Sequence, residues 1–230
     1  MKCVALSDLH GDLPEDIPEC DVVIIAGDIL PLNIQRDKIK STAWLCNEFK
    51  NWCNFLKCSK VIFIAGNHDF VLYHYLNEMD LGAKEVSEML FGKQNEKIVY
   101  LCQNSFVYDN KKFYGFPWCP NLSKWAFYKS DEDLEEAVKL IPDCDVLISH
   151  CPPGGTLQST VLQQGWNYMA DYGCKELTDI LNFRNIKYCI CGHIHSGKHT
   201  EDEVCGTRIV NVSIKDENYK INYKYYVFEI

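Results

Sequence analysis

A membrane span and a secretory leader are the first features that the sequence lacks. No apolar run in the 230 residues is long enough to cross a bilayer, and Met1-Lys2 leads directly into a strand-like segment instead of a leader's apolar core. Basic residues are also few: 32 Asp and Glu outnumber 23 Lys and Arg, and the net charge is −9. Long nucleic acids are bound mainly through Lys and Arg at their phosphates. We therefore expect a cytoplasmic protein that acts neither on a membrane nor on long nucleic acid.

Cys-x-x-Cys pairs are also absent, although the chain has 13 cysteines. The number is odd and the spacing is scattered, which is not typical of a disulfide framework or a zinc site. We interpret the cysteines as reduced thiols that serve as small apolar core residues. Repeats, low-complexity segments and linkers are missing too, so the sequence predicts one domain over residues 1–230.

Several apolar runs, rich in β-branched residues, predict strands that are buried on both faces. These runs are 3–6, 21–26, 61–65, 145–149 and 186–191. Helical spacing of apolar residues predicts helices over 37–57, 70–91 with a weak point at Gly82, 130–140 opened by a capping box at Ser130, and 171–183.

Alternating or short apolar segments predict further strands. They are 97–101, 105–108 and 112–116, and a hairpin joins the last two. Two more, 207–213 and 221–228, resemble antiparallel strands near an edge. The whole pattern indicates an α/β fold with a mixed or largely parallel pair of sheets.

Polar clusters follow five of the predicted strands. They are Asp8 and His10; Asp28; Asn67, His68 and Asp69; His150; and His193 and His195, which hold five of the seven histidines. Any one of them could be an ordinary turn. Ligands of open α/β sheets bind beyond the carboxyl ends of the strands, so together the clusters predict one convergent site. Carboxylates, an amide oxygen and imidazoles suit divalent metals, and two ions bridged by one carboxylate would use them all.

The order of these motifs resembles that of the calcineurin-like metallophosphoesterase superfamily. Asp-x-His, Gly-Asp, Gly-Asn-His-Asp, a lone His after a strand and Gly-His-x-His occur in sequence between residues 8 and 195. The stretches 113–120 and 149–154 resemble the small intracellular branch that includes the animal metallophosphoesterase-domain-containing proteins. The resemblance implies a four-layer α/β/β/α sandwich with two mixed sheets and metals at the strand carboxyl ends.

The resemblance also implies roles for individual residues. One metal would be bound by Asp8, His10, Asp28 and His195, and the other by Asp28, Asn67, His150 and His193, so that Asp28 bridges the two. His68 would reach the phosphate or protonate the leaving oxygen, and Asp69 would orient its imidazole. The ligands fit Mn, Fe, Zn or Ni, and we favour two Mn ions.

The implied function is a metal-dependent phosphoesterase that hydrolyses a small phosphorylated substrate by attack of a metal-bridging hydroxide. A phosphodiester or cyclic nucleotide is slightly favoured over a monoester. No cysteine needs a nucleophilic role in this reaction. Two alternatives stay open: a nuclease, which the acidic charge disfavours, and a non-catalytic scaffold of the same fold that serves protein assembly.

The aromatic stretch 113–128 has two interpretations. It could cap the cleft and stack a nucleobase, with Trp118 as the residue to test, or it could simply pack onto the core, which we favour. Arg208 could clamp a substrate phosphate, although a solvated or structurally paired arginine fits the sequence as well. His74 and His199 lie outside every motif and receive no role.

Overall fold

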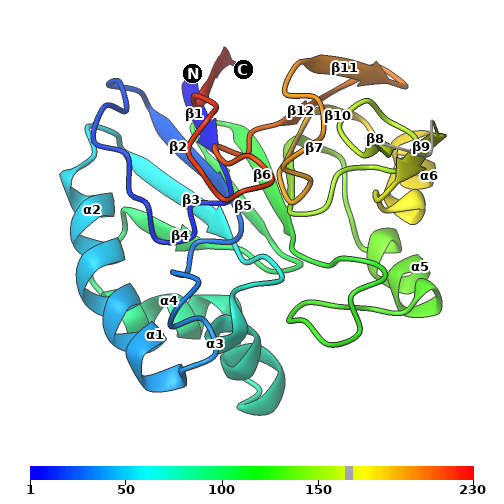
Figure 1. Ribbon diagram of the computed structural model, residues 1–230. Helices are drawn as coiled ribbons and strands as arrows, with labels where there is room; N and C mark the ends of the chain where they lie inside the picture. Colours follow the sequence, from blue (N-terminus) through cyan, green and yellow to red (C-terminus); the bar gives the residue numbers. More distant parts are fainter. Residues whose placement is uncertain (164–167) are drawn as a thin grey trace.

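Two sheets packed face to face form the centre of the computed structural model, which describes residues 1–163 and 168–230 (Figure 1). The first sheet has the order β13-β1-β2-β3-β4, in which only β13 is antiparallel to its neighbour. Its strands are β1 (Lys2–Leu6), β2 (Val22–Ala26), β3 (Lys60–Ile64), β4 (Ile98–Tyr100) and β13 (Tyr226–Glu229).

The second sheet has the order β11-β12-β10-β7-β6-β5, with four parallel strands between two antiparallel edges. Its strands are β5 (Ser105–Tyr108), β6 (Lys111–Phe116), β7 (Cys144–Ser149), β10 (Ile186–Cys191), β11 (Glu201–Val204) and β12 (Thr207–Asn211). A separate antiparallel pair consists of β8 (Thr160–Gln163) and β9 (Tyr168–Asp171).

Helices cover the outer face of each sheet, which makes the four-layer order α/β/β/α (Figure 1). The first sheet is covered by α1 (Lys38–Trp44), the π-helical turn η1 (Leu45–Phe49), α2 (Lys50–Phe55), α3 (Phe70–Tyr73), the π-helical turn η2 (His74–Glu78) and α4 (Ala83–Phe91). The second sheet is covered by α5 (Asp131–Lys139) and α6 (Lys175–Leu181). The predicted fold class is therefore confirmed.

Alternate residues of the central strands enter different core layers. In β2, Val23 and Ile25 pack in the cluster that includes the helices, whereas Val22 and Ile24 pack in the cluster between the sheets. All five residues of β2 are buried, as the continuous apolar run predicts for a strand covered on both faces. This double burial fixes the register of each strand and thus the position of the loop that follows it.

The predicted helix 37–57 is confirmed as the continuous run from α1 through α2, with a π-helical turn in its middle. The helix predicted over 70–91 is interrupted before its weak point, since η2 ends at Glu78 and α4 begins only after Gly82, whose N–H donates to the Glu85 carboxylate at 2.7 Å. Ser130 caps α5 by accepting from the N–H of Asp133, 3.3 Å away. The hairpin at Asp109 and Asn110 has positive φ at both residues, 47° and 59°.

Two boundaries were predicted wrongly. The helix expected from residue 171 begins only at Lys175, because Asp171 ends β9 and its carboxylate accepts from the N–H groups of Gly155 and Gly173 at 2.7 and 3.0 Å. The strand expected over 221–228 shrinks to β13, because residues 221–223 turn back onto Ile214 instead: the N–H groups of Asn222 and Tyr223 donate to its carbonyl at 2.9 and 3.2 Å. The strand predicted near an edge over 207–213 is found as β12, which lies next to the edge strand β11 and antiparallel to it, although it pairs in parallel with β10 on its other side.

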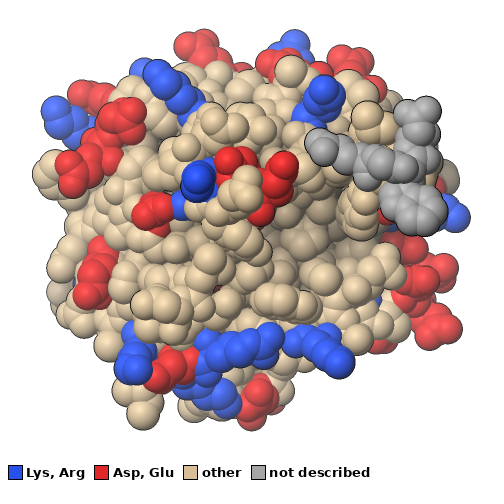
Figure 2. All heavy atoms as spheres, in the orientation of Figure 1, with Lys and Arg blue, Asp and Glu red and all other residues tan. Residues whose placement is uncertain are grey.

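No helix in the described parts of the chain is both long and apolar enough to cross a membrane. Charged side chains of both signs are spread over the face shown in Figure 2. Lys and Arg side chains gather along its lower edge, where Figure 1 places α1, α3 and the loop between β6 and α5.

Candidate metal centre

The carboxyl ends of β1, β2, β3, β7 and β10 bring all the predicted site residues together. One oxygen of Asp28, Oδ2, lies 3.3 Å from His150 Nε2, 3.8 Å from His10 Nε2 and 3.9 Å from His68 Nε2. His195 Nε2 is 3.2 Å from Asp8 Oδ1, and Asn67 Oδ1 is 3.0 Å from His150 Nε2. The His150 and His193 rings are 5.1 Å apart.

The backbone that presents these side chains is strained. Asp8, His10, Asp28 and His193 all have positive φ, between 45° and 67°, a region that L-residues rarely occupy. Such residues cost about 1–3 kcal/mol each and persist only where other contacts fix them. Here the N–H of Asp8 donates to the Gly27 carbonyl at 3.0 Å, and that of His10 to the Asp28 carbonyl at 2.9 Å. Strain concentrated at one cluster is a mark of a functional site.

Two glycines are required by close packing within the cluster. A Cβ at Gly66 would clash with the Asp28 carboxylate and the His150 ring, and one at Gly192 would clash with Ser7 and the Asp8 carboxylate. The Gly-Asn-His-Asp and Gly-His-x-His motifs therefore need glycine for space, so that the strand ends can approach the carboxylates.

Asp69 occupies a different place from the one expected. Its carboxylate accepts from the backbone N–H groups of Asp28, Ile29, Leu30 and Gly66 at 2.8–3.1 Å. The expectation that it orients the His68 imidazole is wrong, because these bonds use both of its oxygens. Asp69 instead ties the loop after β2 to the loop after β3, and so positions Asp28.

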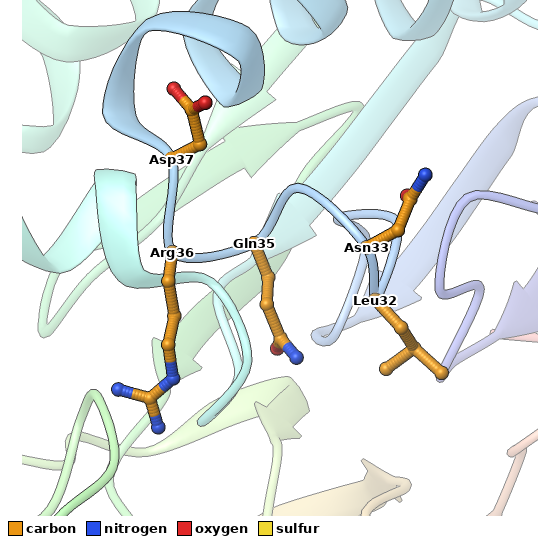
Figure 3. A pocket seen from close by; sticks show the side chains of 5 residues that line it. All are labelled: Leu32, Asn33, Gln35, Arg36 and Asp37. Atoms are coloured by element: carbon orange, nitrogen blue, oxygen red, sulfur yellow. The ribbon is translucent and has the colours of Figure 1, made fainter.

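The His68 ring is held by Gln35, a residue that the sequence did not single out. His68 Nδ1 is 2.6 Å from Gln35 Oε1, and since an amide oxygen only accepts, Nδ1 carries the proton of this bond. Figure 3 shows Gln35 and Arg36 extending from the same side of the loop between β2 and α1, while Asp37 points the opposite way. His68 Nε2 is thereby directed toward Asp28 and the site.

Two other imidazoles are fixed in the same manner. His150 Nδ1 donates to the Ala26 carbonyl at 2.8 Å, and His195 Nδ1 donates to the Asp216 carbonyl at 2.9 Å. A ligating histidine usually donates its second ring nitrogen in this way, which fixes the ring and leaves the first nitrogen for the metal. In both residues the remaining nitrogen, Nε2, faces a carboxylate of the cluster.

His10 shows that the cluster fits a cation. Its side chain is buried, yet neither ring nitrogen has a hydrogen-bond partner among the described residues. Buried polar atoms are rarely left unpaired in this way, because the loss of hydration costs about 1–3 kcal/mol. His10 belongs to two triads of potential metal ligands whose ligand atoms lie within 4.8 Å of one another, Asp8–His10–His195 and His10–Asp28–His68. Asp8, Asp28 and His150 make a third triad.

The pKa values show how the cluster balances its charge. Burial lowers the pKa of His10 to about 4 and, together with nearby His150, that of His193 to about 3, so both rings are neutral as a metal ligand must be. Burial also opposes charge on His150, but Asp28 outweighs it and raises the His150 pKa to about 10. His150 therefore holds a proton where a metal would bind.

Two cysteines also lie near the site. Cys119 and Cys151 stand close enough to His193 to share an ion with it. Burial raises the pKa of both thiols, so they are protonated and are poor ligands beside the carboxylates. This agrees with their interpretation as core residues.

Residues distant in sequence complete the site. The Tyr219 ring lies 5.0 Å from the ring of His10 and 5.1 Å from that of His195, and it lines a pocket of about 260 Å³ with Tyr172 and Glu217. Only the positive φ of Tyr219, 59°, marks it as unusual, and nothing in the sequence signals this conformation.

The aromatic stretch 113–128 mostly packs in the core, as favoured. Trp118 is 6% exposed and so cannot stack a nucleobase, and Phe127 is fully buried. Trp125 alone in this stretch is in ring contact with a predicted site residue, with its ring 4.5 Å from that of His68.

Arg208 donates to the Tyr188 hydroxyl at 3.1 Å, and it lies near the amino end of β12, away from the strand ends that form the site. His74 lies beside Glu78 on the surface. His199 stacks on Tyr223 and donates to the His195 carbonyl at 3.1 Å, so it supports the loop of a site residue.

Comparison with known proteins identifies the class. Residues 1–197 match the calcineurin-like phosphoesterase family, so the chain belongs to that family. Human metallophosphoesterase domain-containing protein 1 is 28% identical over 236 residues, which cover 95% of this chain and 68% of that protein. The family implies a hydrolase that uses divalent metal ions.

Solved structures confirm the fold. TT1561 of Thermus thermophilus aligns with a TM-score of 0.59 at 14% identity, over 91% of this chain and 88% of its own. The phosphopantetheinyl hydrolase of Mycobacterium tuberculosis aligns with a TM-score of 0.53 at 16% identity, over 95% and 90%.

The position of Asp69 leads to a testable prediction. Asp69→Asn keeps the shape of the side chain but turns one acceptor oxygen into a donor that faces backbone N–H groups. We expect metal affinity to fall about 10- to 100-fold, the usual effect of losing an outer partner of a metal site. Isothermal titration with Mn²⁺ measures it. Asp145→Asn, which alters a half-buried carboxylate near the amino end of β7 that also accepts from a backbone N–H, that of Lys112, is the control away from the site. Unchanged affinity in Asp69→Asn would show that this residue does not position Asp28.

Proposed function

We propose that this protein is a dinuclear metal-dependent phosphodiesterase whose single domain spans residues 1–230. The observation that carries the proposal is the position of Asp28, whose Oδ2 lies within 3.9 Å of three imidazoles that come from different loops. A carboxylate in that central position suits the bridge between two cations.

The ligands divide into two sets that share Asp28. Asp8, His10 and His195 would complete one set, in keeping with their triad. Asn67, His150 and His193 would complete the other, supported by the 3.0 Å separation of Asn67 and His150 and the 5.1 Å separation of the His150 and His193 rings. Imidazole and carboxylate ligands fit Mn, Fe, Zn or Ni, and we favour Mn.

Two divalent ions, if bound by these residues, would supply an activated water and neutralise the charge of the phosphate oxygens. The protein residues supply the rest. Asp28 would join the two ligand sets, and Asp69 fixes Asp28 through the Asp28 backbone N–H. The imidazolium form of His68 would donate its Nε2 proton to the leaving oxygen and become neutral, while its Nδ1–H stays bonded to Gln35, which prevents the ring from turning.

The charge of the pocket favours a diester over a monoester. The described residues that line it include Glu217 but no Lys or Arg. A monoester at neutral pH carries more negative charge on its phosphate than a diester does, and the described lining of this pocket offers no Lys or Arg side chain to balance the excess. A diester needs less charge compensation, and the metal ions alone can supply it.

Metal content and turnover together test the proposal. Protein reconstituted with Mn²⁺ should hold two ions per chain and hydrolyse bis-p-nitrophenyl phosphate, and Asp28→Asn should weaken the binding of both ions because one carboxylate serves both. Elemental analysis and a colorimetric assay measure the two properties. A single ion at saturating Mn²⁺ would contradict the dinuclear site, and two ions without turnover would favour a scaffold.

Two histidine variants separate acid catalysis from metal binding. His68→Ala should keep two ions but lose about 10²–10⁴-fold in turnover of substrates with an alkoxide leaving group, the usual scale for a general acid. Activated p-nitrophenyl esters should lose less, because p-nitrophenolate leaves without a proton. His150→Ala should lose metal affinity, and excess Mn²⁺ should restore part of its activity.

Metal titration and rates with both substrate types distinguish these variants. Loss of metal from His68→Ala, or an equal slowing of both substrates, would show that His68 is not the acid.

A further inference from the structure

A second pocket adjoins the candidate metal centre. It has a volume of about 390 Å³, and its lining includes Arg36, Lys38, Lys124, Phe70 and Trp125. It lies next to the site because Trp125, which forms part of its wall, packs against the His68 ring at 4.5 Å. The loop that carries Trp125 is tied to the site as well, since the N–H of Ala126 donates to the carbonyl of Asn67 at 3.2 Å.

Arg36 is fixed in this pocket in a conformation that can bind an anion. Its Cζ lies 4.0 Å from the centre of the Phe70 ring and 5.2 Å from that of Trp125. Stacking of this kind fixes the faces of a guanidinium and leaves the N–H groups at its edge free. Within the described residues, Arg36 makes no ion pair, and Asp37 points away from it (Figure 3).

The local charge differs in sign from that of the whole molecule. Three cations line the pocket, Arg36, Lys38 and Lys124, against one carboxylate, Glu78, which pairs with Lys38 at 3.1 Å. This excess of positive charge occurs in a protein whose net charge is −9. Figure 2 shows Lys and Arg side chains along the lower edge of the molecule, where Figure 1 places α1 and α3. A cleft lined by charges of one sign raises the local concentration of ligands that carry the opposite charge.

We propose that this pocket binds a second phosphate group, carried by the leaving-group side of the substrate. The inference rests on the proposed function. The ring of His68, the proposed acid, contacts that of His10 at 4.7 Å and that of Trp125 at 4.5 Å, so the pocket adjoins the group that would protonate the departing alcohol. Arg36 would bind the second phosphate through its free N–H groups, and Lys124 would add charge. The substrate class is then a phosphoester of an alcohol that itself bears a phosphate.

Competitive inhibition of bis-p-nitrophenyl phosphate hydrolysis tests the inference. Adenosine 5′-monophosphate and adenosine 3′,5′-bisphosphate differ by one phosphate, so the ratio of their inhibition constants reports the second binding site. For the wild-type protein we expect the bisphosphate to bind about 10- to 100-fold more tightly, the scale of a charge-assisted hydrogen bond. Because each ratio is taken within one variant, changes in turnover cancel.

Arg36→Gln should bring this ratio close to one, and Arg36→Lys should keep part of the preference. Lys124→Gln changes an exposed side chain, so a smaller fall in the ratio is expected there without risk to folding. Lys40→Gln is the matched control: it removes the same charge from α1, but Lys40 pairs with Asp37 at 3.3 Å and does not line the pocket, so the wild-type ratio should persist.

Equal inhibition by the two nucleotides, or an unchanged ratio in Arg36→Gln, would overturn the inference while leaving the proposed function intact. If the metal-loaded wild-type protein does not hydrolyse bis-p-nitrophenyl phosphate, the proposed function and the inference fail together.

Discussion

The burial of two carboxylates is the constraint on which the rest of the structure depends. Asp8 is fully buried and Asp28 is 2% exposed, and in the described parts of the chain no Lys or Arg forms an ion pair with either. An isolated buried charge costs several kcal/mol, so it must be compensated by a partner. In the absence of metal the partners are imidazoles: Asp28 keeps a proton on His150, and Asp8 raises the pKa of His195. Divalent cations at this cluster would compensate the same charge and displace those protons.

The fold keeps these two carboxylates buried and prevents the site from collapsing. Strands covered on both faces cannot shift register, so each one delivers its loop to a fixed point. Asp69 then joins two of these loops through four backbone N–H groups, and Gly66 and Gly192 allow the loops to approach. The positive φ values of Asp8, His10 and Asp28 are sustained by this framework. The position of the Asp28 carboxylate is thus set by these surrounding groups.

The parts of this arrangement that could be predicted from sequence are those encoded locally. Continuous apolar runs marked the buried strands, and the polar residues directly after them marked the site. Asp69 shows what sequence alone cannot predict. Because it follows His68 in the sequence, we predicted a bond between the two side chains, but the loop geometry directs the Asp69 carboxylate to backbone N–H groups instead. Gln35, Trp125 and Tyr219 reach the site from distant segments, and only tertiary packing places them there. The antiparallel strands β8 and β9 carry no strong apolar pattern, and their residues are exposed or half-buried.

Anomalous diffraction at the manganese edge, from crystals grown with Mn²⁺, tests the central claim most directly. The account predicts two peaks about 3.5–4 Å apart, with the Asp28 carboxylate between them and Asp8 and His150 on opposite sides. A single peak, or a second peak that Asp28 does not touch, would contradict it.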